Sequence, residues 1–249
     1  MTKTKNSITV RAVCVQGHHH SIKGLACQDY CRHFIGKDKF IGVISDGAGS
    51  AKYGKIGARI VCDTMVDLLA KSSFSQAKKH ILNAVRIARD KAVFHRYNKT
   101  KNESGLNDFA ATLVGAFYHK GKGLFFHIGD GAALALKDNT LHDFIISRPE
   151  NGLFSCETFF YTMNDWEASL RFTSFENAHS VFLMSDGLTS FAFTNNFERL
   201  ENGFIAPIHD FLCKEKNKSK ALKALNNTLN TEKAQRLNSD DKTLLWARL

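Results

Sequence analysis

The spacing of apolar residues along the first hundred positions changes from the period of a strand to that of a helix. Residues 8–16 alternate and are rich in β-branched types, which predicts a strand, and residues 40–45 predict a second, short and apolar one. From Ala51 to about residue 70 the apolar residues recur at helical spacing. Residues from about 76 to 97 carry small and apolar side chains on one face and charged ones on the other. The pattern therefore predicts two strands followed by two long helices.

The middle of the chain predicts a run of strands. Residues 109–118, 123–128 and 132–137 are apolar segments separated by glycine turns, at Gly121 and at Asp130-Gly131. We expect these three segments to form successive strands of one antiparallel meander.

The remaining elements are less regular. Residues 146–178 are irregular and aromatic, and they predict a flap-like segment rather than a regular element. The other predicted elements are strands at 140–145, 180–185 and 242–249, and helices around 206–213 and 219–230. Clustered strands with long helices between them predict an α+β layered fold. We find neither repeats nor a low-complexity linker, so we expect residues 1–249 to form a single domain.

Composition places the chain among folded proteins. Apolar residues make up 43% of the sequence and only two residues are prolines. The start shows no apolar core of the kind that a signal peptide needs, and no stretch approaches the roughly 18 apolar residues of a membrane span. The six cysteines form no Cys-x-x-Cys pair. We therefore expect a cytoplasmic protein with reduced thiols and no membrane partner.

A positive charge surplus favours anionic partners. The formal net charge is +10, from 34 basic and 24 acidic residues, which suits nucleic acid or phosphorylated substrates. The basic residues are scattered, however, and they do not interleave with aromatic residues as in a single-strand binding groove. We therefore do not expect a nucleic-acid partner, and a two-metal nuclease ranks last among the functions considered.

Two apolar strands end in the same tripeptide, Ser-Asp-Gly. Asp-Gly is a strong hairpin signal, but a hairpin needs a second strand directly after it. Gly47 instead leads into the predicted helix after Asp46, and Gly187 leads from Asp186 into LTSFAF, which does not alternate. Asp130 differs, because a strand follows it at once, and it fits a hairpin turn.

Further carboxylates lie beside strand ends. Asp240 and Asp241 precede the closing strand, and Asp29 lies between the first two predicted strands. Each could be an ordinary solvated loop acid. If the strands are neighbours, however, the acids converge with Asp46 and Asp186, and their repulsion requires cations. Oxygen ligands without His or Cys at ligand spacing select hard metals, namely Mg²⁺, Mn²⁺ or Ca²⁺.

Six short motifs occur in an order that resembles a known family, the metal-dependent type-2C protein phosphatases (PPM family), and in particular a bacterial branch of it. Each motif is weak alone, but together they span residues from about 8 to 249. The motifs are CQD at 27–29, SDGAGSA at 45–51, FAATL at 109–113, IGDGAAL at 128–134, MSDGL at 184–188 and SDDKTLL at 239–245.

This resemblance implies a fold and a metal centre. The fold is a four-layer αββα sandwich, in which two antiparallel β-sheets lie face to face with helices outside. The centre holds two Mn²⁺ or Mg²⁺ ions, and the family pattern allows a third. The implied metal-binding positions are Asp46 as the bridge, the Gly47 carbonyl, Asp186, Asp240, Asp29 through a water, Asp130 for the third ion and, most weakly, Asp241.

The resemblance also implies an activity. Asp46, Asp186 and Asp240 would activate a metal-bound water that hydrolyses a phosphomonoester, and the substrate would be a phosphorylated protein, the target of a Ser/Thr kinase. No covalent intermediate is required. The aromatic residues 153–166 would form a variable flap beside the active site, although plain packing explains most of them equally well.

Three positions depart from the family pattern. Gln28 stands where a Glu is common, Gly24 where an Arg grips phosphate, and Ala48 where a His often follows Asp-Gly. In the bacterial branch His20 occupies a characteristic His position, and Lys23 is the nearest cation that could replace the Arg. The departures leave open a degenerate phosphatase module that binds a phosphoprotein or a regulatory partner without turnover.

Overall fold

The computed structural model describes residues 7–100, 105–138, 141–149 and 158–249. Twelve strands lie among these residues, and ten of them form two five-stranded antiparallel sheets. The first sheet has the spatial order β1 (Thr9–Val15), β12 (Lys242–Arg248), β9 (Ser180–Met184), β6 (Ala132–Leu136) and β7 (Phe144–Ser147). The second has the order β2 (Tyr30–Gly36), β3 (Lys39–Ser45), β4 (Leu113–His119), β5 (Lys122–Ile128) and β8 (Arg171–Glu176).

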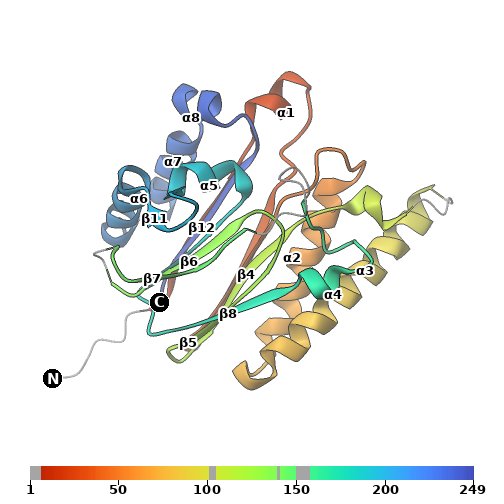
Figure 1. Cartoon of the computed structure of the whole chain (residues 1–249), viewed down its shortest axis with the longest axis horizontal. Helices are drawn as coiled ribbons and strands as arrows, with labels where there is room; N and C mark the ends of the chain where they lie inside the picture. Colours follow the sequence, from red (N-terminus) through yellow and green to blue (C-terminus); the bar gives the residue numbers. More distant parts are fainter. Residues whose placement is uncertain (1–6, 101–104, 139–140, 150–157) are drawn as a thin grey trace.

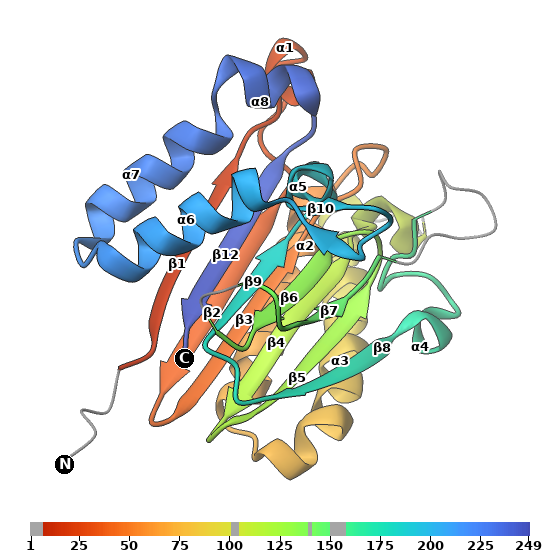
Figure 2. The same cartoon turned by 60° about the vertical axis from the view of Figure 1, so that its left-hand side comes forward.

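Helices cover the outer faces of both sheets (Figure 1). The helices α2 and α3 lie on one side of the strands, and α6 and α7 lie on the other (Figure 2). The helical segments are α1 (His18–Ile22), α2 (Gly54–Ala70), η1 (Phe74–Gln76), α3 (Ala77–Thr100), η2 (Leu106–Phe109), α4 (Trp166–Ser169), α5 (Asp186–Ala192), α6 (Asn202–Lys214), α7 (Lys218–Leu229) and α8 (Glu232–Leu237). A short pair, β10 (Phe193–Thr194) and β11 (Arg199–Leu200), follows α5.

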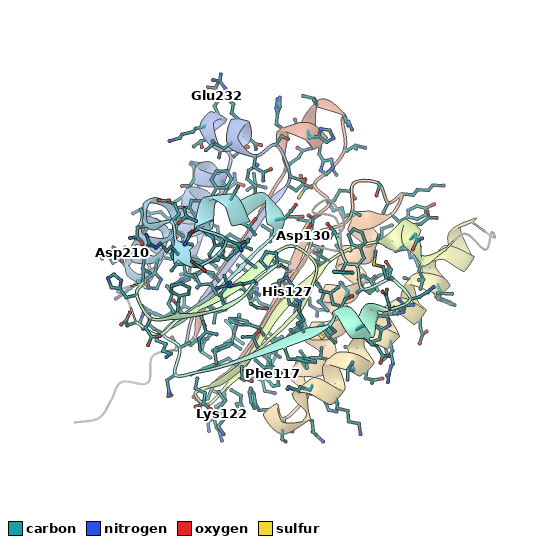
Figure 3. The ribbon with its side chains drawn as sticks, viewed as in Figure 1. Phe117, Lys122, His127, Asp130, Asp210 and Glu232 are labelled. Atoms are coloured by element: carbon teal, nitrogen blue, oxygen red, sulfur yellow. The ribbon has the colours of Figure 1, made fainter. Side chains whose placement is uncertain are left out.

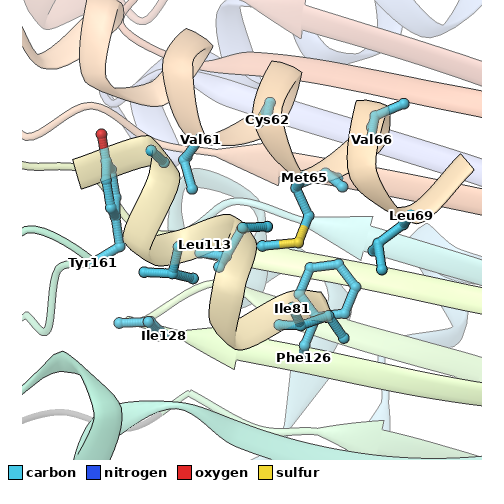
Figure 4. Close-up of a cluster of buried hydrophobic side chains, with 14 of the residues drawn as sticks. Val61, Cys62, Met65, Val66, Leu69, Ile81, Leu113, Phe126, Ile128 and Tyr161 are labelled. Atoms are coloured by element: carbon cyan, nitrogen blue, oxygen red, sulfur yellow. The ribbon is translucent and has the colours of Figure 1, made fainter. Parts of the chain in front are cut away.

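Three apolar layers hold these elements together. The outer face of the second sheet packs on α2 and α3, where Met65, Ile81 and Phe126 are fully buried (Figure 4). The two sheets pack on each other through residues such as Phe125 and Leu245. The first sheet packs on α5, α6 and α7 in a third cluster. Each face of each sheet therefore has an apolar partner, and the predicted αββα sandwich is confirmed.

The structure corrects the predicted meander. The β4–β5 turn is a hairpin as expected, with positive φ at Lys120 and Gly121. Strands β5 and β6, however, belong to different sheets. Asp130-Gly131 is therefore a crossing between sheets, and the hairpin interpretation of Asp130 is wrong. Gly129 has φ 111° there, which lets the chain turn between the two layers.

Within the two five-stranded sheets, two strands escaped prediction, and both lie at sheet edges. Strand β2 was not expected at all, and β8 lies inside the segment 146–178 that was expected to be irregular. An edge strand is covered less completely than a central one, and six of the seven β2 residues are only partly buried. Because they carry polar residues such as Arg32 and His33, these strands lack the apolar signal of β3 or β9.

Smaller differences concern helices and element ends. The segment after Gly187, which has no clear pattern, forms α5, and α1 and α8 were not expected. The strand expected from residue 109 begins at Leu113, because Phe109 ends a short 3₁₀ helix. Residues 139–140 and 150–157, including parts of the predicted strand at 140–145 and of the flap, lie outside the described residues. Within the described part of the chain, no helix has the length and apolar character needed to cross a bilayer.

Candidate metal centre

The antiparallel register brings the predicted acids to one end of the sandwich. In the second sheet Ser45, the last residue of β3, pairs with Tyr30, the first residue of β2. Asp46 directly follows β3 and Asp29 directly precedes β2, so the two acids lie at neighbouring strand ends. In the first sheet Met184 pairs with both Leu244 and Ala132. The segments containing Asp186, Asp240 and Asp130 therefore leave or enter that sheet side by side. Figure 3 shows Asp130 at this end and Lys122 at the opposite end of β5.

Four of these carboxylates line a single cleft of about 530 Å³. Asp46 comes from the end of β3, Asp130 from the crossing between sheets, Asp186 from the start of α5, and Asp240 from the loop before β12. These residues are up to 194 positions apart (240 − 46) in the chain. The cleft is thus built from both sheets, and neither sheet alone contains it.

The glycines of the two Ser-Asp-Gly motifs permit close backbone approach. Neither Gly47 nor Gly187 is among the described residues with positive φ, so neither adopts a left-handed turn conformation. A Cβ on Gly47 would lie 2.3 Å from the Gly54 carbonyl carbon, and one on Gly187 would lie 1.9 Å from the Asp241 backbone oxygen. The Asp-Gly pairs are therefore strand-to-helix junctions packed against a second backbone segment, as the missing alternation after them indicated.

The serines of the same motifs tie the strand ends together, a role that the sequence did not reveal. The Ser45 hydroxyl donates to the Thr112 carbonyl at 2.5 Å, and the Thr112 hydroxyl accepts from the Asp46 N–H at 3.0 Å. The Ser185 hydroxyl donates to Asp29 Oδ2 and accepts from the Thr243 N–H, both at 2.9 Å. The repeated tripeptide was the available signal.

Asp29 lies beneath the cleft. Asp29 is 3% exposed and does not line the cleft. Its Oδ2 accepts from Ser185, but Oδ1, which is buried, has no hydrogen-bond partner among the described residues. Burial, followed by the charge of Asp241, raises the pKa of Asp29 to about 7.

Burial and mutual repulsion disfavour the ionised form of the carboxylates at the cleft. Burial raises the pKa of Asp46 well above its ordinary value, and the charges of Asp29 and Asp186 raise it further. Burial and the charges of Asp130 and Asp240 raise the pKa of Asp186 to about 6. These carboxylates repel one another when ionised, and a cation among them would remove that cost.

The residues present fit hard divalent ions. The donors are carboxylates together with the Gly47 backbone, and Asp29 Oδ1 is a buried acceptor without a hydrogen-bond donor among the described residues. Mn²⁺ and Mg²⁺ prefer such oxygen ligands. No three cleft carboxylates, all of them described residues, have oxygens mutually within 4.8 Å.

A different group of side chains, none of which lines the cleft, meets that spacing. His179, His209 and Cys213 have ligand atoms within 4.8 Å of one another. The Trp246 indole N–H donates to His209 Nδ1 at 3.2 Å, so that nitrogen already has a partner. We therefore assign no metal to this group.

The structure shows the surroundings of the three positions that depart from the family pattern. Gln28 Oε1 accepts from the Lys55 N–H at 3.0 Å near the start of α2, and Gln28 does not line the cleft. Gly24 has φ 65° just after α1, a conformation that an Arg would rarely adopt. Ala48 lines the cleft without a polar group.

His20 and Lys23 both line the cleft from α1 and its C-terminal cap. Lys23 is exposed, whereas the His20 residue is 5% exposed. His20 Nδ1 lies 2.9 Å from Asp241 Oδ2. Asp241 is fully buried and does not line the cleft, unlike the neighbouring Asp240.

The described part of the aromatic segment also reaches the cleft. Thr158 and Phe160 line it, and the Thr158 hydroxyl donates to Asp130 Oδ2 at 2.6 Å. Tyr161 and Trp166 instead pack into the core below α2 and α3. The segment therefore combines a polar contact to a cleft acid with ordinary packing.

Comparison with known proteins identifies the class. The family model for protein phosphatase 2C matches residues 16–230, so the chain belongs to the protein phosphatase 2C family. This membership confirms the resemblance inferred from the six motifs. No curated protein sequence matches the chain.

Solved structures share the fold at low sequence identity. Serine/threonine phosphatase Stp1 from Staphylococcus aureus is similar with a TM-score of 0.68 and 15% identity, over 98% of this chain and 96% of that one. PppA from Pseudomonas aeruginosa, a regulatory component of T6SS, gives 0.66 and 15%, over 98% of each chain. The catalytic domain of serine/threonine protein phosphatase PstP, in complex with two manganese ions, gives 0.64 and 15%, over 97% of each chain.

Proposed function

We propose that this chain is a metal-dependent protein serine/threonine phosphatase. The observation that carries the proposal is the convergence of Asp46, Asp130, Asp186 and Asp240 on one cleft. Family membership supports hydrolysis of phosphorylated protein. We further propose that residues 1–249 act as one domain, since both sheets contribute to the cleft.

In this proposal two Mn²⁺ or Mg²⁺ ions bind in the cleft. Asp46, the Gly47 carbonyl, Asp29 (through a water), Asp186 and Asp240 would hold these ions. Asp130 contributes to a third, weaker position. When bound, the ions would lower the pKa of a water and offset the negative charge of a phosphate ester.

The chain's own groups supply the rest of the site. Gly24 stands where the family pattern has a phosphate-binding Arg, so in this proposal Lys23 contacts the phosphate instead. Lys23 is the exposed cation among the residues that line the cleft. Thr158 orients Asp130 through its hydrogen bond.

The expected cytoplasmic location remains a prediction from the cysteine pattern. The five described cysteines are free thiols, and Cys156 lies outside the described residues.

A metal titration tests the proposal. The purified chain is stripped with EDTA and supplied with Mn²⁺ or Mg²⁺, and hydrolysis of para-nitrophenyl phosphate and of a phosphoserine peptide is measured. We expect activity that requires the metal and falls by at least about 10²-fold in Asp46→Asn. Asp90→Asn, which alters an exposed acid on α3, serves as the matched control and keeps full activity.

Two results would contradict the proposal. Absence of turnover at every metal concentration, together with phosphopeptide binding, would identify a non-catalytic binding module. Activity that survives Asp46→Asn but disappears on thiol alkylation would show a cysteine-based reaction instead. Isothermal titration calorimetry with Mn²⁺ distinguishes a failure of metal binding from a failure of catalysis.

A further inference from the structure

We propose that a lysine-rich surface at the junction of α6 and α7 binds an acidic segment of the protein substrate, outside the cleft. We call it the lysine surface. It consists of five exposed side chains at the end of α6, in the α6–α7 connection and on the first turns of α7, namely Lys214, Lys216, Lys218, Lys220 and Lys223. That the partner is a substrate rests on the proposed phosphatase function, whereas the binding itself does not.

The charge of the lysine surface is poorly balanced. Between Asp210 and Glu232 the sequence has these five lysines and a single acid, Glu215, although basic residues are scattered over most of the chain. Glu215 Oε2 lies 2.8 Å from Lys220 Nζ. The other four lysines form no ion pair with a carboxylate of the described residues. These like charges repel one another, and an anionic partner would remove that cost.

Two arginines beneath the same segment add to its positive charge. Arg11 of β1 is 7% exposed, and its Nη2 donates to the Lys216 carbonyl at 3.3 Å. Arg248 of β12 donates from Nη1 to the Cys213 carbonyl at 3.1 Å. In the described part of the chain, no carboxylate forms an ion pair with either guanidinium. The arginines therefore fix the backbone of the segment without neutralising it.

The lysines are carried by an ordered backbone. Asn217 caps α7, because its Oδ1 accepts from the Lys220 N–H at 3.0 Å. Along α7, Ala221, Leu225 and Leu229 are buried in the cluster that covers the first sheet. Since the backbone is already ordered, a partner has to immobilise only the lysine side chains, which lowers the entropic cost of binding.

The surroundings of the lysines favour a protein segment over a membrane or a nucleic acid. A helix that lies in a membrane interface needs an exposed apolar face. The apolar face of α7 is buried, and none of the exposed large apolar side chains of the described residues lies between residues 211 and 231. Residues 214–223 also contain neither an aromatic ring for base stacking nor an arginine for bidentate phosphate recognition. Carboxylates require only the charge that lysine supplies.

The lysine surface is separate from the cleft. None of its five residues lines the cleft. Figure 3 shows Asp210, which lies one turn before Lys214 on α6, well apart from Asp130 in the cleft. An acidic segment bound here therefore leaves the cleft free, and it raises the effective concentration of a phosphorylated residue on the same substrate.

A binding measurement tests the surface without turnover. Fluorescence anisotropy follows a labelled (Glu-Ser)₅ peptide on the metal-free protein at about 20 mM salt. We expect the Kd to rise at least about tenfold at roughly 300 mM salt, and to a similar extent in Lys216→Glu/Lys218→Glu. The matched control Lys78→Glu/Lys79→Glu, with the same charge change at exposed positions of α3, keeps the wild-type Kd. The Lys216→Glu/Lys218→Glu variant should also bind a (Lys-Ser)₅ peptide more tightly than the wild type, which a misfolded protein would not do.

A kinetic measurement tests the assignment to a substrate. Two phosphoserine peptides carry, beyond a Gly-Ser linker of about 30 residues, either a (Glu-Ser)₅ tail or a (Gln-Ser)₅ tail. For the metal-loaded chain we expect the acidic tail to lower KM at least about tenfold with unchanged kcat. The advantage should disappear in Lys216→Glu/Lys218→Glu and persist in Lys78→Glu/Lys79→Glu.

The failures of the two proposals are distinguishable. A wild type that binds (Glu-Ser)₅ but hydrolyses neither phosphopeptide refutes the proposed function and leaves binding by the lysine surface intact. Hydrolysis of both phosphopeptides with equal KM refutes the assignment of the acidic segment to a substrate. Binding of (Glu-Ser)₅ that is absent, or equal in the two charge variants, refutes the lysine surface. Tighter binding of oligo(dT) or of phosphatidylserine vesicles, lost in Lys216→Glu/Lys218→Glu, would replace the acidic segment by that partner.

Discussion

The Ser185 hydroxyl donates to Asp29 Oδ2 at 2.9 Å, although the two residues are 156 positions apart in the chain. The same hydroxyl accepts from the Thr243 N–H at 2.9 Å. One side chain thus joins the end of β9, the start of β12 and the acid that precedes β2. Strands β9 and β12 belong to the first sheet and β2 to the second. The hydrogen bonds of Ser185 therefore fix one sheet against the other directly under the cleft.

Replacement of this serine should destabilise the protein. Ser185→Ala leaves the buried Thr243 N–H and one Asp29 oxygen without a partner, and we expect a loss of about 1–3 kcal/mol in the free energy of unfolding. Urea denaturation measures it. Ser190→Ala, at an exposed position on α5, is the control and should stay within about 0.5 kcal/mol of the wild type. Equal stability of both variants would contradict the role of Ser185.

The metal-free protein should lose stability as pH rises. The pKa of Asp29 is raised to about 7 and that of Asp186 to about 6, both from an ordinary value of 3.8. Between pH 4 and 7 the folded state therefore binds more protons than the unfolded state, and the free energy of unfolding falls with pH. Thermal denaturation in EDTA should give a lower Tm at pH 8 than at pH 5.

Added Mn²⁺ provides the control for this pH dependence. The ion favours ionised carboxylates, so it should raise the Tm more at pH 8 than at pH 5. A metal-free Tm that rises between pH 5 and pH 8 would show that other groups dominate the titration and that the cleft acids are not mutually repulsive.

Gly187 should tolerate no side chain. A Cβ there would lie 1.9 Å from the Asp241 backbone oxygen, and backbone cannot move aside as a flexible side chain can. We expect Gly187→Ala to cost at least about 2 kcal/mol of stability. We also expect weaker Mn²⁺ binding, because the clash would push α5, and Asp186 with it, away from the loop before β12. Gly105→Ala, where the nearest atom to a Cβ is 3.8 Å away, is the matched control. Wild-type Mn²⁺ affinity in Gly187→Ala, measured by calorimetry, would be evidence against this packing.

Lys242 should matter most in the absence of metal. It is fully buried, and its Nζ donates to the Asp240 carbonyl at 2.8 Å and to Gln235 Oε1 at 3.2 Å. The cation offsets part of the charge of the nearby carboxylates, so Lys242→Met should lower the Tm of the metal-free protein more than that of the Mn²⁺-loaded protein. Lys79→Met on the exposed face of α3 should affect both forms equally. An equal loss in the two forms of Lys242→Met would reduce the lysine to a packing role.

Much of the fold was predictable because its central elements carry a clear period. Strands β3 and β9 are almost continuous apolar runs, and α2 and α3 each present one apolar face, so their positions follow from the sequence alone. The edge strands β2 and β8 were not predictable in this way, because one side of each has no strand partner and their side chains remain partly exposed.

The site was predictable in its residue types and not in its contacts. Asp46 and Asp186 stood out because a strand ended in Asp-Gly without a second strand after it. Whether Asp130 belonged with them could not be decided locally, since a hairpin and a crossing between sheets both place Asp-Gly between two strands. The difference depends on which sheet β6 joins, and that is a long-range pairing with β9 and β7.

The sequence by itself determined the alternation of apolar segments, the carboxylates at the strand ends and the order of motifs that marks the family. Only the tertiary structure decided that Asp240 opens onto the cleft whereas its neighbour Asp241 turns inward to His20. The physical reason is that both residues lie in the loop before β12, where no strand pleat fixes the direction of a side chain, so the packing of α1 and the second sheet around that loop determines which side is solvent and which is buried.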